Sequence, residues 1–415
     1  MNLSKSLKII LLIVYFILCI ITNLLYKKKL FEKSLTIAKD FQTKFNSNFS
    51  KLFFSIITQF GAQYFYIPVF IIFFFLNPLN YFVYILTTLL LSISITSLSK
   101  IIYNDPRPFF IKADLFQECE VGFGNPSAHS FGATATYLGI WHLSMNCKKF
   151  KNNNKIKYGS LIFTFIFIFT ILISRLYRGV HSIDQIIYGG LLGLGFYYFM
   201  FFILDIYKLK PKEFLEKIDK DKFIFISIFA SLIILSLPFY FILQKNDKNI
   251  KNYKDIIEKN CSHVKEFNRL YNNGLLGCLL VTLILGMYLG LIFLKKKCDK
   301  EFSDYEDKIL NLNKTNLKTN LIRSFIFLFF GFPIVLALLI SSSSNLFIVF
   351  FFKIGLSFFL SSFSMFRFGI YFGYYININD IDKNYYPQIN DREISEYTSV
   401  NPSPPEKFSI VEIQY

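Results

Sequence analysis

Long apolar blocks without charge limit this chain to a narrow range of folds. Residues 160–174 and 223–243 contain no charged side chain, and residues 7–26 contain a single Lys and no acidic residue. A helix needs roughly twenty apolar residues to cross about 30 Å of hydrocarbon. Helices of soluble proteins keep a polar face and rarely stay uncharged over such a length. The blocks therefore predict an integral membrane protein built from helices.

Hydropathy predicts roughly ten transmembrane helices, and therefore an all-α polytopic fold. The expected spans are residues 7–26, 52–76, 80–98, 129–146, 157–175, 182–205, 223–243, 274–294, 321–341 and 345–374. The segment 27–51 is too polar to span and is expected at the membrane interface. Its apolar side would carry Leu30, Phe31, Leu35, Ile37 and Phe41. The tail 376–415 is polar and contains proline, so we expect it to be disordered.

The net charge of +17 is explained by the loops between the spans. The Lys-rich loops 147–157, 206–222 and 295–320 fall on one face, which the positive-inside rule assigns to the cytoplasm. The chain is therefore expected to contact membrane lipids and not nucleic acid. The first span has no cleavage signal and is expected to stay as a signal anchor. These features predict the endoplasmic reticulum or the plasma membrane, and the sequence carries no signal of oligomeric state.

Three polar clusters interrupt the apolar pattern at the ends of spans. They are residues 100–108, 125–130 and 174–181, and they contain two of the four His residues. Because successive spans alternate in direction, all three clusters are expected on one membrane face, toward the lumen or the exterior. Ionisable groups at such positions are candidates for a functional site.

The residue types in these clusters suit a phosphate group. Lys100, Arg107 and Arg175 supply cations, and Arg makes forked contacts with phosphate oxygens. The start of a helix near Ser127 adds a hydroxyl and backbone N–H donors. Two His residues offer a nucleophile and a proton donor. The nearby sequence has no metal-binding pattern, so we expect a site without metal or cofactor, in which cations carry the charge that Mg²⁺ carries elsewhere.

The joint pattern resembles the type 2 phosphatidic acid phosphatase and haloperoxidase superfamily. The matching motifs are Lys100 through Arg107-Pro108, then Pro126-Ser127-Ala128-His129, then Ser174-Arg175 through His181. The resemblance covers roughly residues 52–205. It implies a phosphatase core of six helices in residues 1–205, with its motifs within 100–185. Residues 206–375 would then add about four transmembrane helices.

The resemblance also implies a role for each matching residue. His181 would attack phosphorus and form a phosphohistidine, and His129 would protonate the leaving alcohol. The phosphate would be held by Lys100, Arg107, Ser127, Arg175 and the backbone amide of Ala128.

Two positions depart from the family pattern. Ala128 replaces the usual Gly but keeps the amide donor, as in members that resemble sphingosine-1-phosphate phosphatases. The family Asp, four residues after the nucleophile, is Gln185 here, and Asp184 stands one residue earlier. On a helix both side chains could reach His181. The ungapped register favours Gln185 as the residue that orients His181, and Asp184 remains the alternative.

These features predict a metal-independent phosphatase acting on a lipid phosphate of the long-chain-base phosphate or phosphatidate type. The segment Gly179-Val-His-Ser-Ile183 and the extra spans are similar to long-chain-base phosphatases. The alternative is a sugar phosphatase similar to glucose-6-phosphatase, which Gln185 favours. A lipid phosphotransferase is a third possibility. A non-catalytic homologue fits less well, because both His residues and all the cations are present.

Overall fold

The computed structural model describes residues 4–62, 79–115, 120, 122–146, 153–209, 211–246, 253, 277–301, 325, 329 and 355–370. The secondary structure in this part of the chain is helical, which confirms the predicted all-α class. Within these described residues, five segments are long and apolar enough to cross a membrane: Lys5–Lys44, Asn80–Ile111, Asn154–Tyr177, Ile183–Leu204 and Gly277–Lys296. The predicted tail 376–415 and nearly all of the predicted span 321–341 lie outside the described residues.

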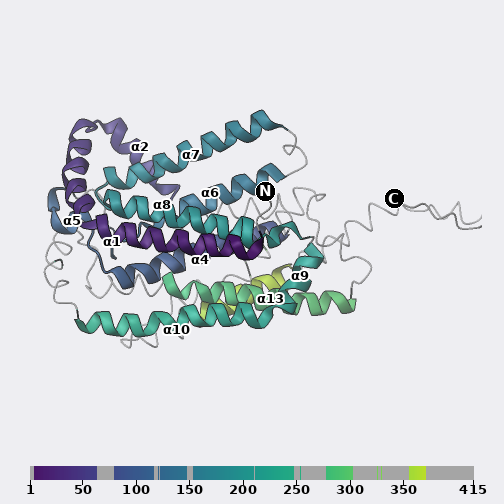
Figure 1. The fold of residues 1–415 in the computed structure, drawn as a ribbon. Coiled ribbons are helices and arrows are strands. Elements are labelled where there is room, and N and C mark those ends of the chain that lie inside the picture. The colour runs from purple at the N-terminus through teal and green to yellow at the C-terminus, as the bar shows by residue number, and fades with distance from the viewer. Residues whose placement is uncertain are drawn as a thin grey trace, which may run out of the picture.

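A bundle of long helices surrounds α6 (Ala128–Asn146), which packs against α4 (Leu79–Tyr103), α7 (Asn154–Tyr177) and α8 (Ile183–Tyr198) (Figure 1). A π-helical turn, η3 (Phe199–Leu204), continues α8. The sequence predicted α6 as a span at 129–146, but α6 is not among the five apolar segments. Its central position explains this, because most of its side chains face other helices and need not be apolar enough for lipid.

Glycines bring α6 and α8 into close contact. A Cβ atom added to Gly193 would lie 2.6 Å from the carbonyl oxygen of Phe131. A Cβ atom added to Gly189, one turn earlier, would lie 2.5 Å from that of Ser127. Small residues spaced by four positions allow helix backbones to approach in membranes. This contact fixes the start of α6 against the start of α8, where two of the polar clusters lie.

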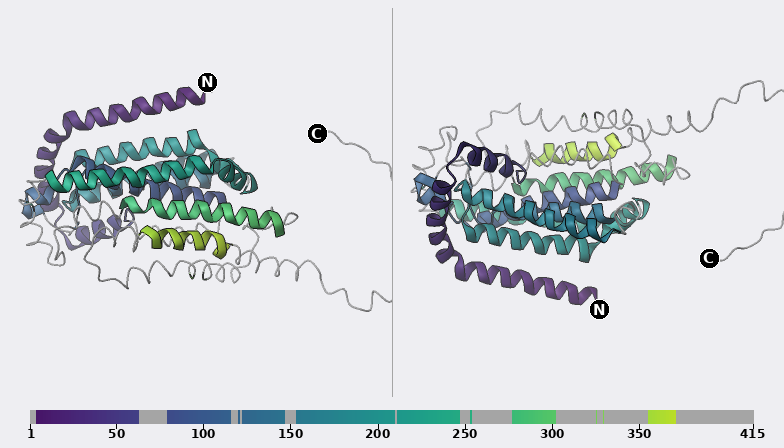
Figure 2. Two further views of the ribbon diagram at one scale, coloured as in Figure 1. Left: turned by 90° about the horizontal axis from the view of Figure 1, so that it is seen from below. Right: turned by 90° about the horizontal axis from the view of Figure 1, so that it is seen from above.

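Helix α1 (Lys5–Lys44) is one continuous helix of 40 residues. Figure 2 shows that its first part runs along the bundle and that its second part turns across one end of it. The predicted interfacial segment is therefore the second part of α1. Ser34, Ala38 and Gln42 are buried, whereas Ile37 is 44% exposed. Small and polar residues face inward because they hydrogen-bond to loops, as Gln42 Nε2 does to the carbonyl oxygen of Tyr177 at 2.7 Å.

Short helices cover the two ends of the bundle. The end that α1 crosses carries α2 (Asn48–Gln59), α5 (Pro108–Ile111) and the 3-10 turn η2 (Ala113–Leu115). The other end carries the 3-10 turn η4 (Ile206–Lys208) and the helix α9 (Pro211–Lys220).

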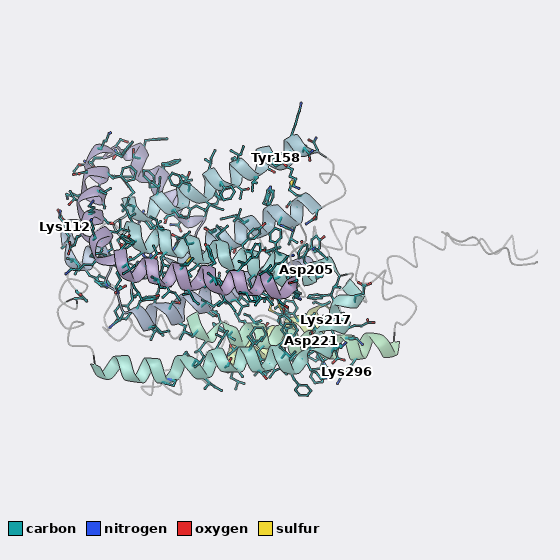
Figure 3. All side chains as sticks on the ribbon, viewed as in Figure 1. Lys112, Tyr158, Asp205, Lys217, Asp221 and Lys296 are labelled. Carbon is teal, nitrogen blue, oxygen red and sulfur yellow. The ribbon has the colours of Figure 1, made fainter. Side chains whose placement is uncertain are left out.

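The polar clusters and the Lys-rich loops lie at opposite ends of the bundle. Figure 3 places Lys112, beside the first cluster, at one end, and Tyr158, Asp205 and Lys217 at the other. The predicted alternation of span direction therefore holds for α4, α6, α7 and α8.

A second group of helices packs against α4 beside the central bundle. It consists of α10 (Lys222–Asn246), α13 (Val281–Glu301), α17 (Leu356–Ser364) and its π-helical continuation η7 (Met365–Gly369). Gly286 of α13 approaches Phe359, and Gly290 approaches Phe363. Helices α13 and α17 therefore run in the same direction. The three polar clusters lie within residues 100–181, and none of their residues belongs to this second group of helices.

The α6–α8 contact can be tested with one added methyl group. Gly193→Ala should push α8 away from Phe131 and lower the melting temperature of the detergent-solubilised protein, because overpacking typically costs about 1–3 kcal/mol. Gly159→Ala is the matched control, since a Cβ atom there meets nothing within 4 Å. Melting curves followed by size-exclusion chromatography would measure both variants. An unchanged melting temperature for Gly193→Ala would contradict the close contact.

Candidate active site

The first cluster forms where α4 ends. Lys100 lies in the last turn of α4, and Asn104 then adopts a positive φ of 52°, which ends the helix. Pro108 occupies the first turn of α5, where its missing N–H is not needed. Arg107 is the N-cap residue of α5, so the turn directs its side chain into the bundle, where it is 1% exposed.

The second cluster begins α6. Ser127 is fully buried, and its hydroxyl oxygen accepts the Ser130 N–H at 3.4 Å, as an N-cap residue does. Its own N–H donates to the carbonyl oxygen of Gln185 at 3.1 Å, which ties α6 to α8. Ala128 and His129 form the first turn of α6, with both residues half-buried.

The third cluster joins α7 to α8 through a tight turn at Gly179. Gly179 has a φ of 68°, and a Cβ atom there would collide with the carbonyl oxygen of Leu115. Only glycine adopts this conformation without strain. The turn returns the chain so that the His181 N–H lies 3.4 Å from the carbonyl oxygen of Arg175. Both side chains consequently point to the same interior region, where Arg175 is 1% exposed and His181 is fully buried.

The arginines converge on Glu120, in the loop between the first two clusters. Arg107 Nη1 contacts one carboxylate oxygen of Glu120, and Arg175 Nη2 contacts the other at 2.6 Å. Arg107 Nε also donates to the carbonyl oxygen of Gly122 at 2.7 Å. Arg175 Nη1 contacts the hydroxyl of Thr58 from α2. Lys100 is close enough to interact electrostatically with this group.

Glu120 is the principal residue of this cluster that the sequence did not predict. Burial alone would raise its pKa, but Arg107 and Arg175 hold the pKa well below its usual range, so the carboxylate is charged. A charge-balance consideration could have found it. Several cations brought together in a low-dielectric region need an anion, and the stretch between the first two clusters contains few acidic residues.

The two His residues approach different oxygens of the Glu120 carboxylate. His181 Nε2 lies 3.7 Å from Oε2, and His129 Nδ1 lies 3.9 Å from Oε1. Burial and the Arg107 guanidinium hold the pKa of His181 well below its usual range, so its imidazole is neutral at pH 7. The two rings therefore flank the position that the carboxylate occupies.

Gln185 fixes the orientation and the tautomer of His181. The Gln185 amide Nε2 donates to the carbonyl oxygen of Pro106 at 2.9 Å, so its Oε1 faces His181 Nδ1, at 3.1 Å. An oxygen at this position accepts a proton from Nδ1, which leaves the lone pair on Nε2. Arg107 Nη1 is 3.2 Å from Nε2 and can only donate, which requires the same tautomer. Both contacts favour the tautomer in which Nδ1 carries the proton and Nε2 faces the cations with its lone pair.

Asp184 lies in the first turn of α8. It is 5% exposed and lines a pocket of about 300 Å³ together with Lys27, Phe31 and Asp105. Its Oδ1 atom has no hydrogen-bond partner among the described residues. Of these two neighbours, Gln185 is the one that contacts the His181 ring within the part of the chain that the structure describes.

An outer layer of polar contacts holds the first two clusters to α1. Asp105 forms an ion pair with Lys27 of α1 at 3.0 Å. The Asn125 side chain donates to Asp105 Oδ2 at 2.8 Å and to Asn23 Oδ1 of α1 at 3.1 Å. The sequence did not single out these residues, because no motif marks them.

Comparison with known proteins identifies the central bundle. A family model described as the PAP2 superfamily matches residues 81–207, less than half of the chain. The match runs from α4 to η4 and contains the three polar clusters. Searches of curated proteins and of solved structures gave no match. Residues 81–207 of this chain are therefore a PAP2 superfamily domain.

Proposed function

We propose that the chain is a metal-independent phosphatase that hydrolyses a lipid phosphate through a phosphohistidine intermediate. PAP2 superfamily members are generally phosphatases. The observation that carries the proposal is the position of His181 Nε2, an unprotonated nitrogen directed at an anion bound between Arg107 and Arg175. In the structure that anion is the Glu120 carboxylate, and in the reaction it would be the phosphate of the substrate.

In the first step His181 Nε2 attacks phosphorus, and the bond between phosphorus and the alcohol oxygen breaks. The alcohol oxygen takes its proton from His129, which approaches the anion from its other oxygen. Arg107, Arg175 and Lys100 would stabilise the charge on the phosphoryl oxygens. Gln185 would keep the Nδ1 proton of His181 in place while the ring becomes cationic.

In the second step a water molecule attacks phosphorus and breaks the phosphorus–nitrogen bond. His129, now without its proton, accepts a proton from that water. Inorganic phosphate forms, and His181 Nε2 recovers its lone pair. If a second alcohol replaced water, the same residues would perform a phosphotransfer.

The place of the site in the bundle favours a lipid substrate. The three clusters lie at one end of helices long enough to cross a membrane, so a phosphate there could be reached by a headgroup whose tail stays in the bilayer. We favour a long-chain-base phosphate or a phosphatidate. The contact between Gln185 and His181 keeps a sugar phosphatase similar to glucose-6-phosphatase as the second candidate.

A phosphate-release assay on the purified protein in mixed micelles with EDTA tests the function. Sphingosine-1-phosphate and phosphatidate should be hydrolysed faster than glucose-6-phosphate. His181→Ala should abolish release and any covalent phosphate on the protein, because no other group would attack phosphorus. His129→Ala should lower turnover by about 10²- to 10⁴-fold, the usual contribution of general acid–base catalysis.

Each result of this assay has a definite meaning. Hydrolysis retained by His181→Ala protein would remove the proposed mechanism. Activity lost in EDTA and restored by Mg²⁺ would contradict metal independence. A clear preference for glucose-6-phosphate would replace the lipid substrate by the sugar phosphate.

The choice between Gln185 and Asp184 is tested by paired substitutions. Gln185→Ala should lower turnover by about 10- to 100-fold, as is typical when the hydrogen-bond partner of a functional His is lost. Gln185→Asp should stay active, since a carboxylate oxygen can accept the same proton. Asp184→Asn is the matched control and should have a mild effect, because Asp184 faces the pocket beside Lys27. A severe effect of Asp184→Asn with a silent Gln185→Ala would reverse the assignment.

Membrane orientation is tested by cysteine accessibility in a background without other cysteines. We propose that the site faces the lumen of the endoplasmic reticulum or the exterior of the cell, with the Lys-rich end in the cytoplasm. Asp114→Cys, at the site end, should react with an impermeant maleimide only from that side. Lys217→Cys, at the opposite end, should react only from the cytoplasm. The reversed labelling pattern would invert the proposed orientation.

A further inference from the structure

Glu120 occupies the position at which the proposed reaction needs a phosphate. Its two carboxylate oxygens are bound by Arg107 and Arg175, and both His rings lie within 4 Å of them. No step of the proposed mechanism uses this carboxylate. Arg107 Nη1 and Arg175 Nη2 must release Glu120 before they can bind a substrate phosphate in its place.

We propose that Glu120 is an internal anion that holds the empty site in its active arrangement and that phosphate must displace. The inference rests on the proposed function, since it concerns how the same site takes up and releases phosphate. Glu120 is thereby a positioning residue that sets the affinity for phosphate. It need not contact the substrate during the chemical steps.

Exposure of the side chains supports displacement. The Glu120 side chain is 25% exposed, whereas the side chains of Arg107 and Arg175 are 2% and 1% exposed. The carboxylate therefore lies on the solvent side of the arginines and covers them. The arginines are held in place by Gly122 and Thr58 whether or not Glu120 contacts them.

Charge explains why phosphate can win the competition. Lys100, Arg107 and Arg175 together exceed the single negative charge of Glu120. A phosphate monoester carries up to two negative charges and offers more oxygens in forked geometry to Arg. The site consequently favours phosphate over a carboxylate. A neutral sugar or lipid hydroxyl carries no charge and therefore does not displace Glu120 from the arginines.

The competition also affects product release. Phosphate can bind only to the fraction of molecules in which Glu120 has left the arginines. The apparent affinity for phosphate is therefore lowered in proportion to that fraction. The same competition favours the departure of inorganic phosphate after the reaction, because Glu120 replaces it at the arginines. Removing the charge of Glu120 should therefore make phosphate bind more tightly.

The test compares competitive inhibition by inorganic phosphate and by orthovanadate in the full-length protein at constant ionic strength. Glu120→Gln keeps the size of the side chain and loses its charge, and it should lower both inhibition constants by about tenfold or more. Glu120→Asp keeps the charge on a shorter arm and should give an intermediate decrease. Asp114→Asn is the matched control, since it removes a carboxylate that pairs with Lys39 at the same end of the bundle. Its inhibition constants should equal those of the wild type.

Other roles for Glu120 give different results. A catalytic role would lower kcat and leave the inhibition constants unchanged, which would overturn the proposal. A purely structural role would lower the melting temperature and weaken phosphate binding, which would also overturn it. If Glu120→Gln does not fold, Glu120→Asp carries the test, and an unchanged constant in that variant contradicts displacement. Failure of the phosphatase proposal itself is distinguishable, since the wild type would then neither hydrolyse monoesters nor bind phosphate.

Discussion

Concentrated positive charge at one end of a membrane bundle dominates the organisation of this protein. Lys100, Arg107 and Arg175 arrive from three points of the chain, and two of them are almost fully buried. Isolated charges in such surroundings are costly, and removing one partner of a buried pair leaves the other uncompensated. The carboxylate of Glu120 meets this requirement in the structure. The loop between the first two clusters is therefore as necessary to the site as the helices that carry the motifs.

A single residue, Gln185, links the three polar clusters. The Gln185 side chain contacts the His181 ring of the third cluster through Oε1 and donates from Nε2 to the carbonyl oxygen of Pro106 in the first. The backbone carbonyl oxygen of Gln185 accepts the Ser127 N–H of the second cluster. These contacts require α6 and α8 to lie close together, which the absence of side chains at Gly189 allows. Close packing of two helices thus sets the distance between the proposed nucleophile and the phosphate-binding residues.

Much of this arrangement follows from the sequence, because motif spacing and hydropathy act locally. Hydropathy places α4, α7 and α8 to within a few residues, and alternation of direction brings the three clusters to one end. Glu120 could not be found in this way, since its position depends on the path of a loop and not on a periodic pattern. The burial of Ser34 in α1 could not be found in this way either, because it accompanies a hydrogen bond that the Ser34 hydroxyl accepts from the Ile183 N–H at 2.9 Å. Tertiary hydrogen bonds, which no hydropathy value records, decide such cases.

Helix α1 has a consequence for how the protein is made. It is synthesised before α8, yet its Ser34 contacts a residue 149 positions later, and its Tyr15 hydroxyl donates to the carbonyl oxygen of Leu191, 176 positions later. Contacts of such long range form only after the intervening chain has been ordered. The first helix must therefore wait in the bilayer, beside lipid or the insertion machinery, until α8 has left the ribosome. During that interval its Lys27 lacks the Asp105 carboxylate that neutralises it in the finished protein. Biosynthesis of this membrane protein is complete only when its earliest and latest core helices meet.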